Sequence, residues 1–160
     1  LESERLASPH AALHREPVDL AALAGEVVAS LEGAPAVQLT AASDLPMLAL
    51  DRTRMRLLLR NLLDNALRHS VDAPHPPEIH LRPEGSGLHL TVRDHGPGVP
   101  DEQLPHLAQP FYRPDAARER ATGGVGLGLY LCKLVAQAHG GTFTVRNALP
   151  GLEIAVTLPG

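Results

Sequence analysis

The chain has 160 residues, 44% of them hydrophobic, which is enough for one globular domain with a sizeable core. Its formal net charge of −4 at pH 7 is not that of a nucleic-acid-binding protein, so we expect no nucleic-acid partner. The single cysteine, Cys132, excludes an internal disulfide, and no apolar run reaches the roughly 18 residues of a membrane span. A P-loop enzyme is excluded because the sequence has no Gly-x-x-x-x-Gly-Lys-Ser/Thr motif.

The N-terminal part of the chain predicts a linker followed by a helix. Residues 1–16 are polar and lack a clear period, so we interpret them as the end of a preceding helix plus a linker, with the domain over 17–160. The segment 17–20 predicts the start of a helix with Asp19 as its N-cap. Apolar residues at helical spacing continue this helix to Leu31.

Two short strands and a long helix are predicted next. Residues 37–41 and 47–50 have the composition of strands and flank a polar turn. Asp51 then predicts the N-cap of a helix that runs through about His69, because its apolar residues recur at helical spacing.

The second half of the chain predicts two pairs of strands around an irregular segment. Strands are expected over 78–82 and 88–93, and the chain closes with a hairpin of strands over 142–146 and 152–158. Between the pairs, residues 101–122 are polar, basic and irregular, and we expect a mobile lid there. A third helix, ending near His139, follows this segment.

These elements predict an α+β fold in the form of a two-layer α/β sandwich. Helices alternate with pairs of strands along the chain, and hairpin connections outnumber helical crossovers. We therefore expect a mixed, mostly antiparallel sheet of about five strands with three helices on one face.

The predicted helix over 51–69 carries a polar cluster beside its apolar stripe. Asn61, Asn65 and Arg68 fall within an arc of roughly 60° at about 100° per residue. Asparagine is a mediocre helix former, so two of them here require an explanation. They either form a solvated edge, or supply oxygen ligands for Mg²⁺ together with a phosphate contact from Arg68.

A lone carboxylate, Asp94, ends the second strand of the first pair and precedes the turn Gly96-Pro97-Gly98. Such a group at the rim of a core can accept a hydrogen bond from an exocyclic amine such as N6 of adenine. The alternative is an ordinary Asp-x-Gly turn.

A glycine-rich segment, 123–129, leads into the third predicted helix. Bare backbone N–H groups and the positive end of a helix dipole suit a phosphate chain, and glycine permits its close approach. Taken alone, this is a weak signal, because glycines before a helix more often form a flexible loop.

Together, in this order, these motifs resemble the nucleotide-binding boxes of the ATP-binding catalytic domain of bacterial sensor histidine kinases, a GHKL or Bergerat fold. The resemblance runs from about Pro17 to Pro159. The matching segments are residues 61–69 (N box), 94–99 (G1 box), Phe111-Tyr112-Arg113 (F box) and 123–129 (G2 box).

The resemblance implies a role for each matching residue. Asn65, supported by Asn61, would bind the Mg²⁺ that bridges the phosphates of ATP. Asp94 would accept from adenine N6. The other implied nucleotide-binding residues are Arg68, His69, Gly96, Gly98, Val99, Phe111, Gly124, Gly126, Leu127, Gly128 and Leu129. Arg113, Arg118 or Arg120 would reach the γ-phosphate, and Arg113 is the candidate catalytic residue.

The residue at position 61 favours phosphoryl transfer over hydrolysis. Related gyrase-type and chaperone ATPases resemble one another in having a glutamate there, which activates water, whereas Asn61 cannot take up a proton at neutral pH. Transfer depends mainly on positioning and charge neutralisation. An ATPase of the same fold, an anti-sigma-type serine kinase and a nucleotide-binding regulatory module remain alternatives.

The phosphoacceptor histidine is expected outside this chain. None of the nine histidines is followed by Asp or Glu, as the acceptor of the family is. We interpret six of them as ordinary surface or strand residues and His95 as incidental to its motif: the six are His10, His75, His80, His89, His106 and His139.

The partners that the resemblance implies are the protein's own dimerisation and phosphoacceptor helical domain, which would end within 1–16, and a response regulator. We expect this part of the chain to be monomeric and cytoplasmic, and the full-length protein to be a homodimer anchored in the inner membrane.

Overall fold

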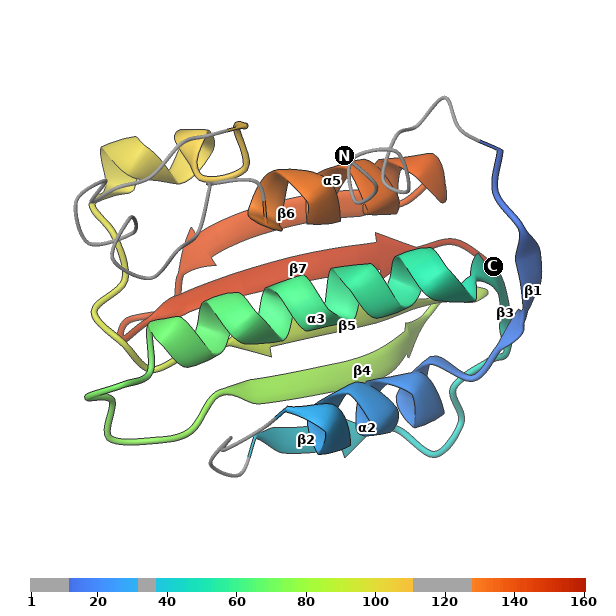
Figure 1. The fold of residues 1–160 in the computed structure, drawn as a ribbon, viewed down its shortest axis with the longest axis horizontal. Coiled ribbons are helices and arrows are strands. Elements are labelled where there is room, and N and C mark those ends of the chain that lie inside the picture. The colour runs from blue at the N-terminus through green and yellow to red at the C-terminus, as the bar shows by residue number, and fades with distance from the viewer. Residues whose placement is uncertain (1–11, 32–36, 111–127) are drawn as a thin grey trace.

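A computed structural model describes residues 12–31, 37–110 and 128–160 of the chain. Its main sheet has five strands in the order β2-β4-β5-β7-β6 (Figure 1). Four of them pair antiparallel, and β2 joins the edge of β4 in parallel. Their bounds are β2 Gln38–Ala41, β4 Glu78–Glu84, β5 Gly87–Arg93, β6 Thr142–Asn147 and β7 Leu152–Leu158. The prediction of a mixed, mostly antiparallel sheet of about five strands is confirmed.

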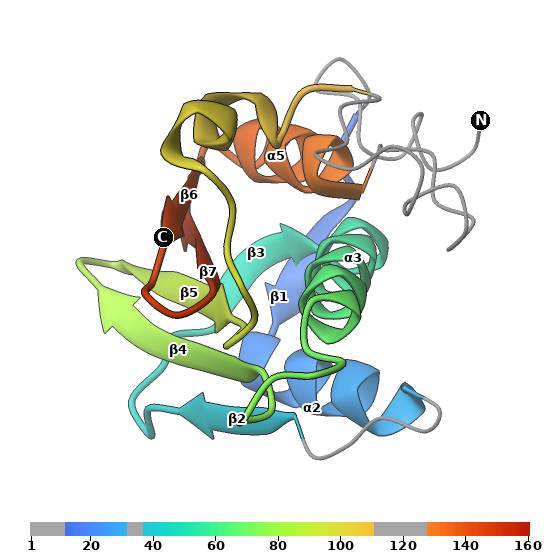
Figure 2. The ribbon, with the colours of Figure 1, turned by 90° about the vertical axis from the view of Figure 1, so that its left-hand side faces the viewer.

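Three α-helices cover one face of this sheet (Figures 1 and 2). They are α2 (Leu20–Ser30), α3 (Arg52–Arg68) and α5 (Gly128–Ala138). Side chains alternate along β5, so that Leu88, Leu90 and Val92 are buried on one face. The two-layer α+β arrangement is therefore confirmed. In the described part of the chain, none of the helices is long and apolar enough to cross a membrane.

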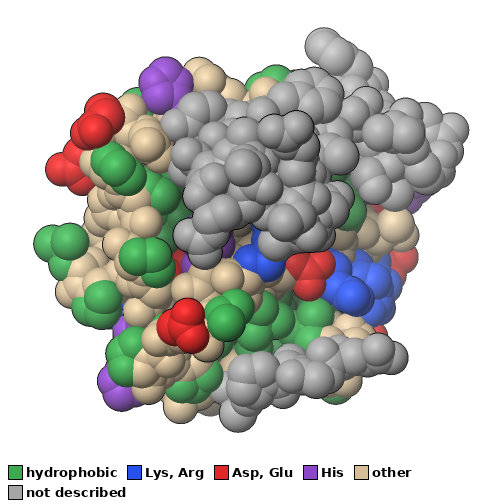
Figure 3. Space-filling view, turned by 60° about the vertical axis from the view of Figure 1, so that its left-hand side comes forward, with side chains coloured by type: hydrophobic (Ala, Val, Ile, Leu, Met, Phe, Trp, Pro, Cys, Tyr) green, Lys and Arg blue, Asp and Glu red, His purple; other side chains and the backbone are tan. Residues whose placement is uncertain are grey.

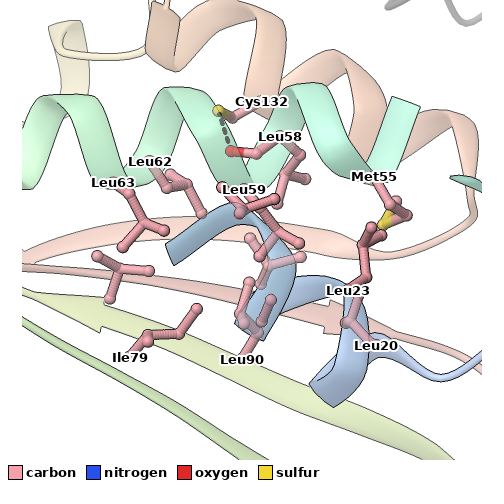
Figure 4. Packing of buried hydrophobic residues seen from close by; sticks show 14 of the residues in the cluster. Leu20, Leu23, Met55, Leu58, Leu59, Leu62, Leu63, Ile79, Leu90 and Cys132 are labelled. Carbon is pink, nitrogen blue, oxygen red and sulfur yellow. Dashed lines mark hydrogen bonds between the residues drawn. The ribbon is translucent and has the colours of Figure 1, made fainter. Parts of the chain in front are cut away.

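The core lies between α3 and the sheet (Figure 4). Leu59 and Leu62 of α3 are fully buried, as is Leu90 of β5. Burying each leucine contributes about 1.5–3 kcal/mol. Cys132 of α5 is also buried and donates through its Sγ to the carbonyl of Leu58, 3.5 Å away. Burial raises the pKa of this thiol far above its ordinary value, so it stays protonated and unreactive.

Both predicted N-caps are confirmed. Oδ1 of Asp19 accepts from the N–H of Ala22 at 3.1 Å, and Oδ1 of Asp51 accepts from the N–H of Arg54 at 3.1 Å. These carboxylates satisfy backbone donors that the first helical turn leaves without partners.

The structure corrects the prediction around residues 15–18. Strand β1 (Arg15–Val18) occupies a segment that we assigned to a linker and the start of a helix. It pairs antiparallel with β3 (Leu48–Asp51) in a separate two-stranded sheet. The two short strands β2 and β3 therefore lie in different sheets. Strand β1 has four residues, and only Val18 among them is buried. Such a short segment with one buried side chain has no hydrophobic period by which a strand could be recognised.

Part of the expected lid is regular. Residues Asp101–His106 form a 3₁₀ helix, η1, with i→i+3 bonds such as Gln103 N–H to the carbonyl of Pro100 at 2.9 Å. Leu107, which follows η1, is buried and anchors it. The rest of the expected lid, residues 111–122, lies outside the described residues.

His139 corrects another prediction, because it is 1% exposed rather than a surface residue. Its Nε2 accepts from the N–H of Asp51 at 3.0 Å, and its Nδ1 donates to the carbonyl of Val135 at 2.9 Å. The side chain thus joins the end of α5 to the start of α3. The sequence did not predict this contact because Asp51 and His139 lie 88 residues apart.

Candidate functional site

The C-terminal half of α3 holds the predicted carboxamides where they flank the core. Asn65 is 7% exposed and belongs to the buried face of the helix, whereas Arg68 is exposed. Asn61 is half-buried, and its Nδ2 is buried without a hydrogen-bond partner among the described residues. A buried amide that protein atoms leave unsatisfied is one that a ligand can engage.

Asp94 follows β5 directly and is 2% exposed. Its Oδ1 accepts from the N–H groups of Gly96 at 3.0 Å and Leu152 at 3.3 Å. Within the described part of the chain both of these bonds go to Oδ1, which leaves Oδ2 for a ligand. Burial raises the pKa of Asp94 above its ordinary value, while the bond from Gly96 and the nearby His69 oppose this shift.

The end of α3 and the Asp94 turn are in direct contact. His69 caps α3, and its N–H donates to the carbonyl of Asn65 at 3.3 Å. The carbonyl of His69 lies so close to Gly96 that a side chain at Gly96 would collide with it. Two motifs that are distant in sequence therefore meet, and glycine is required at the point of contact.

The turn between β6 and β7 contributes residues that the sequence analysis missed. The N–H of Asp94 donates to the carbonyl of Leu152 at 3.0 Å, and Gly151 packs against the carbonyl of Asp94 with φ of +89°. Asn147, at the end of β6, binds Val99 through both of its carboxamide atoms. The hairpin was predicted, but its contacts depend on pairing between segments about 50 residues apart, which no local motif reports.

The remaining candidate residues are divided between described and undescribed segments. Gly98 adopts φ of +69°, which only glycine tolerates readily. Gly128 and Leu129 form the first turn of α5, and a Cβ at Gly128 would meet nothing within 4 Å. Seven others lie outside the described residues: Phe111, Arg113, Arg118, Arg120, Gly124, Gly126 and Leu127.

His95 has specific partners, although we interpreted it as incidental. Its Nε2 donates to Oε2 of Glu78, and its ring packs edge-on against that of His75 with centroids 5.3 Å apart. Glu78 also accepts from Nε2 of His80 at 2.9 Å. These bonds, with that from His95 the largest, hold the pKa of Glu78 below its ordinary value. The Asp94 turn is thus tied to the first residue of β4.

Mg²⁺ is compatible with the donor set of this region. Among the described residues, no group of three or more His, Cys, Asp or Glu side chains is arranged to hold a metal ion. Asn65 and Asn61 offer carboxamide oxygens, which suit an ion that takes few protein ligands and completes its shell with phosphate and water. Figure 3 shows Lys or Arg side chains beside acidic ones on one face of the molecule.

Comparison with known proteins places this chain in a family. Residues 50–160 match the family described as "Histidine kinase-, DNA gyrase B-, and HSP90-like ATPase". Sensor histidine kinase YkoH of Bacillus subtilis is 44% identical over 108 residues, which cover 68% of this chain and 23% of that protein. Alginate biosynthesis sensor protein KinB of Pseudomonas aeruginosa is 41% identical, over 69% of this chain and 18% of that protein. The chain thus spans about a quarter or less of these relatives.

Solved structures agree with the fold. The mycobacterial sensor histidine kinase MprB has a TM-score of 0.74 at 29% identity, over 91% of this chain and 98% of that one. Full-length ShkA in complex with AMPPNP has a TM-score of 0.81 at 24% identity, over 98% of this chain and 33% of that one, which supports the fold alone. The chain belongs to the histidine kinase-, DNA gyrase B- and HSP90-like ATPase family.

Proposed function

We propose that this chain is the ATP-binding catalytic domain of a sensor histidine kinase, which presents Mg-ATP to a histidine on a separate helical domain. One observation carries the proposal: the contact between the His69 carbonyl and Gly96. It joins the end of the helix that bears Asn65 to the turn that bears the buried Asp94. A metal-binding carboxamide and a base-recognising carboxylate are thereby presented to one ligand.

Asp94 is proposed to recognise adenine. Its Oδ2 would accept from the N6 amine, while the bonds from Gly96 and Leu152 to Oδ1 fix the orientation of the carboxylate. His69 would line the base. Gly98 and Val99 would lie beside the base, and the positive φ of Gly98 is the conformation that requires glycine there.

Asn65, assisted by Asn61, is proposed to hold Mg²⁺ together with the phosphates, and Arg68 to contact a phosphate. The ion supplies charge neutralisation when it is bound. Backbone N–H groups of Gly128 and Leu129, at the start of α5, would receive the phosphate chain at the positive end of the helix dipole.

Phosphoryl transfer is favoured over hydrolysis by the amide at Asn61. A carboxamide cannot accept the proton of an attacking water at neutral pH, so this chain's own residues bind, orient and neutralise rather than activate water. The acceptor would be a histidine of the protein's own dimerisation and phosphoacceptor domain, and the phosphoryl group would pass on to a response regulator. We further propose a homodimeric full-length protein, anchored in the inner membrane, with this domain on the cytoplasmic side.

The test is transfer of the γ-phosphoryl group of ATP labelled with ³²P. With the full-length protein, label is expected on histidine, stable in base and labile in acid, and Asn65→Ala should abolish it. Thr53→Ala, at an exposed position of α3, is the matched control and should leave labelling unchanged. Rapid release of free phosphate without labelled protein would instead indicate an ATPase, and label on serine would indicate the anti-sigma type.

A further inference from the structure

One side chain, Asn147, joins the end of β6 to the segment between the Asp94 turn and η1. Its Oδ1 accepts from the N–H of Val99 at 3.1 Å, and its Nδ2 donates to the carbonyl of Val99 at 2.6 Å. The same Nδ2 donates to Oδ1 of Asp101, the first residue of η1, at 3.1 Å. Val99 thus pairs through both of its backbone groups with one carboxamide, as it would with a neighbouring strand.

Gly98 packs closely against the carboxamide of Asn147. Gly98 adopts φ of +69°, and a Cβ there would lie 2.6 Å from Oδ1 of Asn147. Asn147 is the last residue of β6, half-buried where the strand ladder ends. Beyond the end of the strand, its side chain rather than its backbone forms the next hydrogen bonds, and these go to Val99, which is not part of a strand.

The turn that begins at Asn147 also orients Asp94. The N–H of Ala148 donates to the carbonyl of Gly151 at 2.9 Å, which closes the turn, and the N–H of the next residue, Leu152, binds Oδ1 of Asp94 at 3.3 Å. One turn therefore fixes both the orientation of the Asp94 carboxylate and the position of the segment that follows Asp94.

We propose that Asn147 is a positioning residue for nucleotide binding, which holds residues 98–101 in the arrangement that the base side of the site requires. The inference rests on the proposed function. It depends on polarity rather than size, because one carboxamide supplies an acceptor to the N–H of Val99 and donors to two further oxygens. An isosteric side chain without donors cannot do this.

Asn147→Asp is the variant that tests polarity at constant shape. The new carboxylate places acceptors against the Val99 carbonyl and the Asp101 carboxylate. The Kd for Mg-ATP should therefore rise about ten-fold. It is measured by calorimetry at a temperature well below the melting temperature of the variant. In the nucleotide-free chain, hydrogen exchange of the Val99 amide should accelerate while that of Leu90 stays slow. Thr144→Asp adds the same charge to an exposed position of β6 and should leave the Kd unchanged.

Adding Asp101→Asn to Asn147→Asp restores a donor opposite the new carboxylate. The double variant should recover at least half of the lost affinity on a logarithmic scale, a rescue that a merely structural role would not produce. If Asn147→Asp bound Mg-ATP with the wild-type Kd, or if the double variant showed no recovery, the inference would be overturned. The proposed function would still stand in that case, provided that the wild-type chain bound Mg-ATP. A wild-type chain that bound no Mg-ATP would overturn the proposed function itself.

Discussion

Asp94 is the residue on which the proposed base recognition depends. It is buried at the end of β5, and two backbone donors hold one of its oxygens, so the other has a fixed direction. Burial raises the pKa of Asp94, so the proton-free form that accepts from an amine is lost at a higher pH than for an ordinary aspartate.

The substitution Asp94→Asn tests this role at almost constant shape. A carboxamide whose oxygen still accepts from the N–H of Gly96 turns its NH2 group, a donor, toward the base. The affinity for ATP should fall about ten- to hundred-fold, the cost of a lost hydrogen bond to a charged group. Calorimetry with ATP and GTP measures both affinity and preference. An unchanged preference for ATP would reject the role.

His139 is a second residue whose protonation is decided by its neighbours. Burial lowers its pKa, with Arg15 and Arg54 acting in the same direction, while the Val135 carbonyl and Asp51 oppose it. Its Nε2 accepts from the N–H of Asp51, so a proton there would break that bond. A histidine with a lowered pKa stabilises the fold above its ordinary pKa of about 6.5, and this contribution is lost as the pH falls below that value.

His139→Gln should therefore flatten the decline of stability on the acid side of about pH 6.5, since glutamine does not titrate. At pH 7.5 the variant should lose about 1–2 kcal/mol, because the N–H of Asp51 and the carbonyl of Val135 are less well satisfied. Urea unfolding at pH 7.5 and 5.5 measures both effects. His14→Gln, at an exposed side chain, is the control. An equal loss of stability with acid in the wild type and in His139→Gln would contradict this account.

At the scale of elements, the β6–β7 turn is held to the end of β5 by close backbone contact. Gly151 has φ of +89° and lies against the carbonyl of Asp94, with no room for a Cβ. Gly85, in the β4–β5 turn, has φ of +58° but open space around it. The two glycines share the conformation and differ in their surroundings.

Gly85→Ala should cost about 1 kcal/mol of unfolding free energy from backbone strain alone. Gly151→Ala adds a steric collision with the Asp94 carbonyl and should cost about 1–3 kcal/mol more than Gly85→Ala. Equilibrium unfolding in urea compares them. Equal losses in the two variants would show that the turn is free to move away from Asp94.

The elements that the sequence predicted well carry local signals. Asp19 and Asp51 are recognisable caps, and the apolar spacing of α3 extends over 17 residues. Strand β1 was missed because four residues with one buried side chain give no period. Asn147 was missed because its bonds reach 46 and 48 residues along the chain, and a lone asparagine in a strand predicts nothing by itself.

At the scale of the whole molecule, the candidate site lies where separate segments meet at one end of the sandwich. The end of α3, the turn after β5 and the β6–β7 turn lie at this end (Figures 1 and 2). The contacts of Gly96 and Gly151 join them. The hydrophobic core beneath them sets the spacing of helix and sheet, and with it the distance between these segments. Motif order indicated which residues would converge, whereas only the fold supplies the contacts.

The central claim is that these segments bind a single nucleotide. The most direct test is a titration of the ¹⁵N-labelled chain with Mg-AMPPNP, followed by amide chemical shifts. The largest changes should cluster at Asn65, His69, Asp94, Gly96 and Gly128, and be small along the exposed side of β6. Changes confined to other surfaces, or an unaltered spectrum at millimolar nucleotide, would contradict the account.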